Sequence, residues 1–252
     1  MNNLYRIVVA ASLLPMLSFA NGGKSFIDHG AFLSKEQAVN SYELLPPPPE
    51  YKSLVFLNDQ ANYYYGRSLI NSDRWSQAKL DADLSDEGIG SQFSSVVGVE
   101  ISKENTPKLY NLLIKLRKDI DNSVDYAKNH YMRIRPFVLF DKQTCTPDDE
   151  PYLRKSGSYP SGHSTSGWAF ALILSEIIPE RTENILKKGY EYGQSRVICG
   201  AHWQSDVDAG RIMGAAIVAK LQSSAEFNKE FSDVKIEVRN KLKEKRSFAF
   251  PL

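Results

Sequence analysis

Hydrophobic residues recur every three or four positions along most of the chain, which is the spacing of one face of an α-helix. This pattern covers residues 53–70, 106–131, 164–178, 182–199, 206–222 and 226–246. Alternating, strand-like patterns are scarce, and the sequence has no internal repeats. For a chain of 252 residues, we therefore predict an all-α fold, a helical bundle in one domain.

The longest predicted helix begins with Thr106 as its N-cap and Pro107 at its first position, and it stops at Pro136. Its apolar face consists of Leu109, Leu113, Leu116, Ile120, Val124, Ala127 and Tyr131. The helix in residues 53–70 is predicted to bury a face made of Leu54, Leu57, Ala61, Tyr64, Tyr65 and Leu69.

The remaining helices differ in how they are expected to pack. Residues 164–178 are nearly all apolar, which predicts a buried helix. Gly189 and Gly193 lie one turn apart in residues 182–199, so a neighbouring helix can approach closely there. Residues 206–222 are rich in small side chains and suit the same kind of contact. The charges of residues 226–246 are predicted to form a solvated face.

Residues 1–20 have the layout of a secretory signal peptide. A short start with one cation, Arg6, precedes an apolar run that ends in small residues suited to cleavage after Ala20. An uncleaved membrane anchor is the alternative, but the run is short and Pro15 interrupts it. We therefore expect export to the periplasm.

Residues 21–50 form an N-terminal extension that ends in four consecutive prolines, residues 46–49. Such a run favours a stiff polyproline II segment. A rigid connector over the body of the domain is the favoured interpretation, and a recognition motif for a partner domain is the alternative. The helical domain then spans residues 51–252.

Composition narrows the possible partners. The chain is 42% hydrophobic and 24% charged, and its formal net charge is +1, which falls to zero when residues 1–20 and their single cation are removed. This balance does not indicate a nucleic-acid polymer as partner. No second apolar stretch approaches membrane-spanning length, so the mature chain is expected to be soluble and free of the membrane.

Three segments carry residues suited to one chemistry. Lys128 and Arg135 are seven residues apart, which on a continuous helix places both cations on the core face, where an anion must meet them. Ser161 and Gly162 open the helix after Pro160, and a helix start offers free backbone N–H groups to an anion.

The third segment combines a cation with a histidine and a carboxylate. Arg196 precedes His202 by six residues, and Asp206 follows one helical turn later, within reach of one ring nitrogen. That contact would fix the tautomer and leave the other nitrogen free as a nucleophile. With His163 as a second histidine, the three segments supply what phosphoryl transfer requires: donors for three oxygens, a nucleophile and an acid.

The arrangement Lys128-x6-Arg135-Pro136, Pro160-Ser161-Gly162-His163 and Ser195-Arg196-x5-His202-x3-Asp206 resembles the three-part signature of the phosphatidic-acid-phosphatase-type and vanadium-haloperoxidase superfamily. Within it, the segments LNDQ, HYMRIRPF, GSYPSGHS and GQSRVICGAHWQSDVDAGR resemble the class A bacterial non-specific acid phosphatases. The similarity spans the mature chain. Ser164 and Ala201 depart from the family residues, Thr and Tyr, outside the signature.

The resemblance implies an all-helical, periplasmic phosphomonoesterase of broad specificity, without metal or other cofactor and often oligomeric. It makes His202 the nucleophile that forms a phosphohistidine, Asp206 its orienting carboxylate and His163 the acid for the leaving group. The phosphate oxygens would be held by Lys128, Arg135, Ser161, Gly162 and Arg196. Ser94 and Ser95 are assigned to the pocket lining by the same analogy. His130, off the face shared by the two cations, is expected to be structural, and His29 has no evident partner.

The two cysteines of the chain, Cys145 and Cys199, leave two interpretations open. In an oxidising compartment they are expected to form a disulfide beside the phosphate-binding segments. Two buried free thiols are the alternative.

Other functions suit parts of the same pattern. A vanadate-dependent haloperoxidase would use the same oxyanion ligands, and a lipid phosphatase would be expected to carry membrane-spanning helices. An inactive anion-binding helical protein would leave the nucleophile, the acid and the three cations unexplained. Small phosphomonoesters are therefore the expected substrates, with transfer of the phosphoryl group to alcohols as a further possibility.

Overall fold

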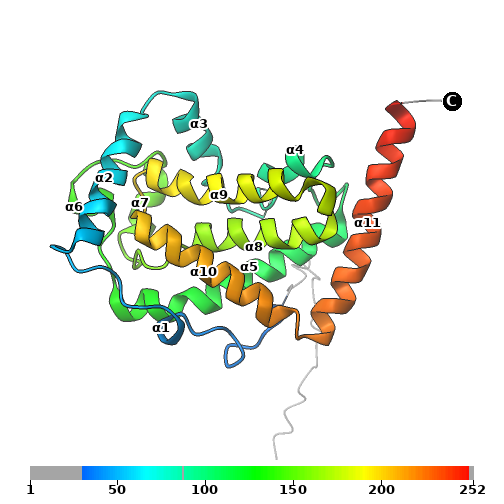
Figure 1. Cartoon of the computed structure of the whole chain (residues 1–252), viewed down its shortest axis with the longest axis horizontal. Coiled ribbons are helices and arrows are strands. Elements are labelled where there is room, and N and C mark those ends of the chain that lie inside the picture. The colour runs from blue at the N-terminus through cyan, green and yellow to red at the C-terminus, as the bar shows by residue number, and fades with distance from the viewer. Residues whose placement is uncertain (1–29, 87, 250–252) are drawn as a thin grey trace, which may run out of the picture.

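The structure is a computed structural model that describes residues 30–86 and 88–249. All regular elements in these residues are helices, and they surround one central helix, α8 (Gly162–Ile177) (Figure 1). Helices α9 (Thr182–Ile198) and α10 (Gln204–Leu221) pack along α8, and α5 (Pro107–Tyr131) also contacts it. The all-α prediction is confirmed.

Helices α8, α9 and α10 follow one another with short connections, so α9 runs antiparallel to the other two, and α8 and α10 run parallel (Figure 1). Close packing depends on small residues, because a Cβ atom on Gly189 would collide with Ala171 of α8 and one on Gly210 would lie 2.7 Å from the Ser161 carbonyl oxygen. Helix α8 is buried along most of its length. The predictions of a buried helix and of close glycine contacts are confirmed.

Helix α5 begins as predicted, with Thr106 at the N-cap position and Pro107 following. The Thr106 hydroxyl does not cap the helix; instead the carboxylate of Glu237 accepts hydrogen bonds from the backbone N–H groups of Lys108 and Leu109 at 3.1 and 3.0 Å. Glu237 belongs to α11 (Ala225–Ala249), whose apolar residues pack on the core while its other faces carry charge. The six aliphatic residues predicted to line the apolar face of α5 are at most 2% exposed.

The prediction that Arg135 lies on the same helix as Lys128 is wrong. Helix α5 ends at Tyr131, Met132 adopts a left-handed conformation with φ of 41°, and Arg135 is extended with φ of −77° and ψ of 153°. Proline disfavours the helical conformation of the residue before it, and here Pro136 instead starts the short helix α6 (Pro136–Leu139).

The predicted face of α2 (Leu54–Ser68) is also wrong, although the helix itself is present. Leu54, Leu57 and Tyr65 are 83%, 53% and 65% exposed, and the buried residues are Phe56, Asp59, Tyr63 and Gly66. A Cβ atom on Gly66 would lie 2.9 Å from the Ile198 Cα, so α2 packs directly on the α9 backbone. Backbone proximity and the ion pair of Asp59 orient this helix, which a count of apolar residues does not reveal.

The extension before residue 51 contributes to the main core. Phe32 and Leu33 are buried, and their N–H groups donate to the Asp119 carboxylate of α5 at 3.2 and 2.9 Å. The short helix α1 (Ser41–Leu44) packs on α5, and the Tyr159 hydroxyl donates to the Pro46 carbonyl. The proposed signal peptide lies outside the described residues. Among residues 30–86 and 88–249, we find no helix with the length and apolarity needed to cross a bilayer.

Candidate active site

Four helix ends meet at one end of the bundle. The C-termini of α5 and α9 carry Lys128 and Arg196, and the N-termini of α8 and α10 follow Ser161 and Trp203 (Figure 1). The four ends meet because each connection at this end of the bundle joins the C-terminus of one helix to the N-terminus of a helix that runs in the opposite direction. Two helix N-termini also add positive potential there.

Lys128, Arg135 and Arg196 are buried, and no carboxylate among the described residues lies within ion-pair distance of any of them. Lys128 Nζ donates to the Gly157 carbonyl at 2.9 Å, and Arg135 donates to the same oxygen at 3.2 Å. In Arg196, Nε and Nη1 are buried without any hydrogen-bond partner in the described part of the chain. Within residues 30–86 and 88–249, these three cations therefore have no carboxylate as a direct partner.

Burial changes the proton affinity of these cations. Desolvation, helped by the nearby charge of Arg135, lowers the pKa of Lys128 to about 7. Desolvation also lowers the pKa of Arg135 to about 10. A bound anion would stabilise the charged forms of these groups, because its attraction offsets the free-energy cost of their desolvation.

The loop from Leu153 to Gly157 holds the Arg135 side chain. Arg135 Nε donates to the carbonyls of Leu153 and Ser156 at 2.9 and 3.1 Å. Gly157 can present its carbonyl to both cations because it has no Cβ, which would collide with the Lys128 carbonyl oxygen. The fork of Arg135 is therefore fixed by backbone oxygens rather than by a counter-charge.

His202 is 2% exposed and lies between a cation and a carboxylate. Its Nε2 is 2.9 Å from Arg135 Nη1, and its Nδ1 is 3.3 Å from Asp206 Oδ2. Arginine only donates hydrogen bonds, so Nε2 must accept and the ring proton lies on Nδ1. Burial, with the charges of Arg135 and Lys128, holds the pKa of His202 well below its usual value. The imidazole is thus neutral, with its Nε2 lone pair directed at the cation cluster.

Asp206 is fully buried at the start of α10. Its Oδ2 accepts the backbone N–H of Trp203 at 2.8 Å and the hydroxyl of Ser158, and its Oδ1 accepts from Arg133. These contacts fix the carboxylate that faces His202.

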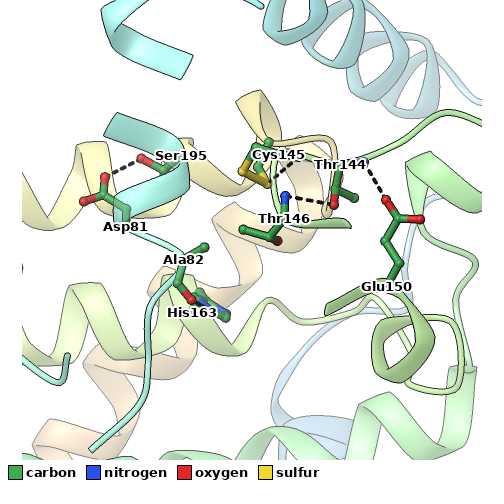
Figure 2. Close-up of a disulfide and its surroundings, with 9 residues drawn as sticks. Asp81, Ala82, Thr144, Cys145, Thr146, Glu150, His163 and Ser195 are labelled. Carbon is green, nitrogen blue, oxygen red and sulfur yellow. Dashed lines mark hydrogen bonds between the residues drawn. A yellow bond between two sulfur atoms is a disulfide. The ribbon is translucent and has the colours of Figure 1, made fainter. Parts of the chain in front are cut away.

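His163 lies in the first turn of α8, and its Nε2 donates to the Ala82 carbonyl at 2.9 Å (Figure 2). A carbonyl only accepts, so Nε2 carries a proton and Nδ1 is the free position. Desolvation and the charge of Arg196 hold the pKa of His163 well below its usual value. Asp81 anchors the Ala82 segment, because its carboxylate accepts from Lys188 at 2.8 Å and from Ser195 at 2.5 Å.

Ser161 caps α8, and its Oγ accepts from the Ser164 N–H at 3.3 Å. The Ser164 hydroxyl donates to the same oxygen at 2.9 Å. A Cβ atom built on Gly162 would meet no protein atom within 4 Å, which leaves the space beside its backbone unfilled. The structure thus gathers all eight residues predicted for catalysis and phosphate binding around one end of the bundle.

A disulfide joins Cys145 to Cys199, with Cα atoms 4.7 Å apart (Figure 2). The Cys145 N–H also donates to the Cys199 carbonyl at 3.0 Å, and Glu150 accepts from the Thr144 N–H at 2.7 Å. The loop after α6 is thereby attached to the turn that precedes His202. At this turn the Ala201 carbonyl, rather than its side chain, accepts from Arg135 at 3.2 Å.

The disulfide should contribute measurably to stability. The unreduced, denatured protein is expected to show no reactive thiol, and two reactive thiols per chain would contradict the bridge. Because the bridge closes a loop with a sequence separation of 54, the loop-entropy model gives about 4 kcal/mol. We expect Cys145→Ala/Cys199→Ala to lower the denaturation midpoint accordingly, as measured in urea without reductant.

Ser94 and Ser95, assigned to the pocket by analogy, lie elsewhere. Ser94 Oγ accepts from the Ile101 N–H at 3.0 Å, and Ser95 is exposed beside a surface hollow bordered by α9. Both serines belong to the short helix α4 (Ser94–Val97), and no hydrogen bond in the described residues connects either of them to the cation cluster. His130 packs against Tyr42 with ring centroids 4.0 Å apart and ring planes tilted by 40°, as expected of a structural residue. His29 lies outside the described residues.

Four contributors to the site were not predicted from the sequence: Asp59, Ala82, Arg133 and Ser158. Arg133 lies two residues before Arg135, and this additional arginine in the segment RIRP is the one signal that could have identified it. Ala82 acts through its backbone carbonyl, which no sequence pattern shows. In the described residues there is also no group of three or more His, Cys, Asp or Glu side chains that could hold a metal ion.

The chain is similar in sequence to one protein superfamily and to several bacterial phosphatases. The PAP2 superfamily model matches residues 112–228, which include every residue predicted for catalysis and phosphate binding. A non-specific acid phosphatase of Providencia stuartii is 51% identical over 207 residues, covering 82% of this chain and 84% of the relative. One from Salmonella typhimurium is 48% identical, covering 83% and 84%, and an acid phosphatase of Zymomonas mobilis is 40% identical, covering 74% and 70%.

Identity of this level over more than two thirds of each protein reaches far beyond the signature residues. It agrees with the helical fold and with the gathering of the signature residues at one end of the bundle. The chain belongs to the class A bacterial non-specific acid phosphatases of the PAP2 superfamily.

Proposed function

We propose that this protein hydrolyses small phosphomonoesters with broad specificity and through a covalent phosphohistidine. The single observation that supports it most is the group of three buried cations, without a carboxylate partner among the described residues, around the accepting nitrogen of His202. The names of its relatives, non-specific acid phosphatase, agree with this proposal.

The first step transfers the phosphoryl group to the protein. His202 Nε2 attacks phosphorus, the P–N bond forms and the bond to the ester oxygen breaks. With the phosphate ester bound, whose negative charge favours a cationic ring, His163 carries a second proton on Nδ1. It gives this proton to the leaving oxygen while its Nε2 stays bound to Ala82. The phosphate oxygens accept hydrogen bonds from the N–H groups of Arg196 and Arg135. One phosphate oxygen takes the place of His202 Nε2 as the acceptor from Arg135 Nη1.

The second step returns the protein to its starting state. Water attacks phosphorus, His163 accepts a proton from it, and the P–N bond breaks to release inorganic phosphate. An alcohol in place of water would give transfer of the phosphoryl group. Asp206 stabilises the positive charge that forms on His202 during both steps.

The proposal extends to the setting of the enzyme. We propose export to the periplasm, because residues 1–20 have the layout of a signal peptide and the two cysteines form a bridge. We also propose a homo-oligomer, since α2 exposes a face with little charge that includes Leu54, Leu57 and Tyr65. Light scattering after size exclusion measures the oligomeric state.

The test of this function is turnover on a panel of alkyl, aryl and nucleoside phosphomonoesters with EDTA present. We expect turnover of all classes, unaffected by the chelator, and competitive inhibition by orthovanadate and inorganic phosphate. Loss of activity in EDTA that a divalent metal restores would contradict the mechanism. Vanadate-dependent bromide oxidation without phosphatase activity would favour a haloperoxidase.

The pH dependence follows from Lys128. Burial lowers the pKa of this amine from 10.5 to about 7, so it is a cation below pH 7 and neutral above it. Phosphate binding gains from the cation, and we therefore expect kcat/KM, which reports the free enzyme, to fall as pH rises through about 7. The measurement is kcat/KM from pH 5 to 9 at constant ionic strength.

Lys128→Arg is the matched variant, because a guanidinium keeps its charge throughout this range. The alkaline fall should move to higher pH in this variant. Comparison of the two proteins on one substrate cancels the ionisation of the phosphate ester itself, whose second pKa is about 6. An unmoved alkaline limb would show that another group controls it.

A further inference from the structure

Arg133 connects the proposed catalytic histidine to a second helix. Its Nη1 donates to Asp206 Oδ1 and to Ser205 Oγ, the latter at 2.8 Å, and its Nη2 donates to Asp59 Oδ2 at 2.8 Å. Arg133 is 7% exposed, and both carboxylates are fully buried. This ion-pair triad links α2 to the start of α10 without touching the cation cluster.

Asp59 has further contacts that keep the triad in place. Its Oδ1 accepts from the Ser205 N–H at 2.7 Å, and its Oδ2 accepts the Ser205 hydroxyl at 2.6 Å. Ser205 lies in the first turn of α10, one residue before Asp206. The carboxylate of α2 thereby fixes both the guanidinium and the backbone that carries the orienting aspartate.

Two arginines of one extended segment bracket the proposed nucleophile and its carboxylate. Arg133 contacts the Asp206 oxygen that faces away from the imidazole, whereas Arg135 contacts His202 Nε2 at the opposite end. The Arg133 carbonyl accepts from the Ser158 N–H at 2.9 Å, and the Ser158 hydroxyl donates to Asp206 Oδ2. The carboxylate is therefore held from both sides, which leaves it one orientation toward His202.

We propose that Arg133, held by Asp59, is a positioning residue that orients Asp206 and through it His202 for attack on phosphorus. The inference rests on the proposed function of His202 as nucleophile. Arg133 itself touches neither the cations nor the space beside Gly162, so it acts on the chemical step rather than on phosphate binding. Misplacement of a reacting group by about 1 Å slows a reaction about 10²-fold.

The variant Arg133→Met/Asp59→Asn tests this role with the charge balance preserved. Removal of the arginine alone would leave two buried carboxylates facing each other, whereas the double variant removes one charge of each sign. We expect kcat and the rate of phosphohistidine formation to fall about 10²-fold, with the Kd for inorganic phosphate within about threefold of wild type. Added guanidinium should restore part of kcat.

Two further variants separate position from stability. Arg133→Lys keeps a charge but cannot span both carboxylates, so its kcat should lie between those of wild type and the double variant. Arg211→Met removes a partly buried arginine whose hydrogen bonds go to Asp208, Tyr190 and Gln194 and to none of the site residues, and it should leave kcat unchanged. All rates are taken per folded protein, as measured by circular dichroism.

The outcomes distinguish the two proposals. Failure of wild type to form phosphohistidine would overturn the proposed function and the role of Arg133 with it. The positioning role alone would be overturned if wild type forms phosphohistidine and either Arg133→Lys or the folded double variant keeps kcat within about twofold of wild type. An equal loss of kcat and phosphate affinity would likewise assign Arg133 to binding.

Discussion

Replacement of His202 with alanine should reduce turnover by about 10⁴-fold or more, because a covalent mechanism has no substitute for its nucleophile. His202 Nε2 accepts from Arg135 and its ring packs in a buried site, so the variant also loses an acceptor for that arginine. The fold should persist, since the helices that form the site pack through other residues. Turnover of an aryl phosphate and the circular dichroism spectrum measure the two expectations.

His163→Ala provides the contrast. It removes the proposed acid rather than the nucleophile, so its effect should depend on the leaving group. Phosphohistidine formation from alkyl phosphates, which need protonation, should slow about 10²–10⁴-fold, whereas formation from aryl phosphates with acidic phenols should slow far less. The later attack of water should slow equally for both classes. Near-normal activity of His202→Ala on an aryl phosphate would show that the nucleophile is a different residue.

Replacement of Arg196 with methionine should have opposite effects on activity and on stability. Nε and Nη1 of this arginine are buried without partners among the described residues, and desolvation lowers its pKa. Removal of an unpaired buried charge should stabilise the phosphate-free protein by about 1–4 kcal/mol. Loss of a donor to the phosphoryl oxygens should lower kcat/KM about 10²–10³-fold.

Thermal unfolding with and without orthovanadate separates these effects. Wild type should gain stability with ligand concentration, by about 2.7 kcal/mol at 100 times Kd, whereas Arg196→Met should gain little. Arg196→Lys is the control, because it retains a charge in the same place. A loss of stability in Arg196→Met without ligand would show that this arginine holds the fold together.

Much of the fold follows from the hydrophobic pattern. The start of α5 and the buried helix α8 were predictable because proline at the first helical position and long apolar runs act locally. The face of α2 was not, because Asp59 and Gly66 orient it through contacts with Arg133 and the α9 backbone. Local periodicity contains no information on such distant partners.

The site shows the same division. Lys128 and Arg135 do bind the same Gly157 carbonyl, as a shared face would allow, yet the helix between them ends at Tyr131. The seven-residue spacing correctly predicted that the two side chains lie close together, but it attributed this to a continuous helix, which is wrong. The contact by which the Ala82 carbonyl fixes the tautomer of His163 was not predictable, because every residue has a backbone oxygen and the residue type does not show which one will be used.

The most direct test of the account is to identify the phosphorylated residue. The enzyme is mixed with a labelled aryl phosphate, quenched in alkali within a single turnover and digested for mass spectrometry under conditions that preserve phosphohistidine. We expect one phosphoryl group on His202 in wild type, and none in His202→Ala. Phosphate on a different residue, or none in wild type while turnover proceeds, would contradict the covalent role of His202.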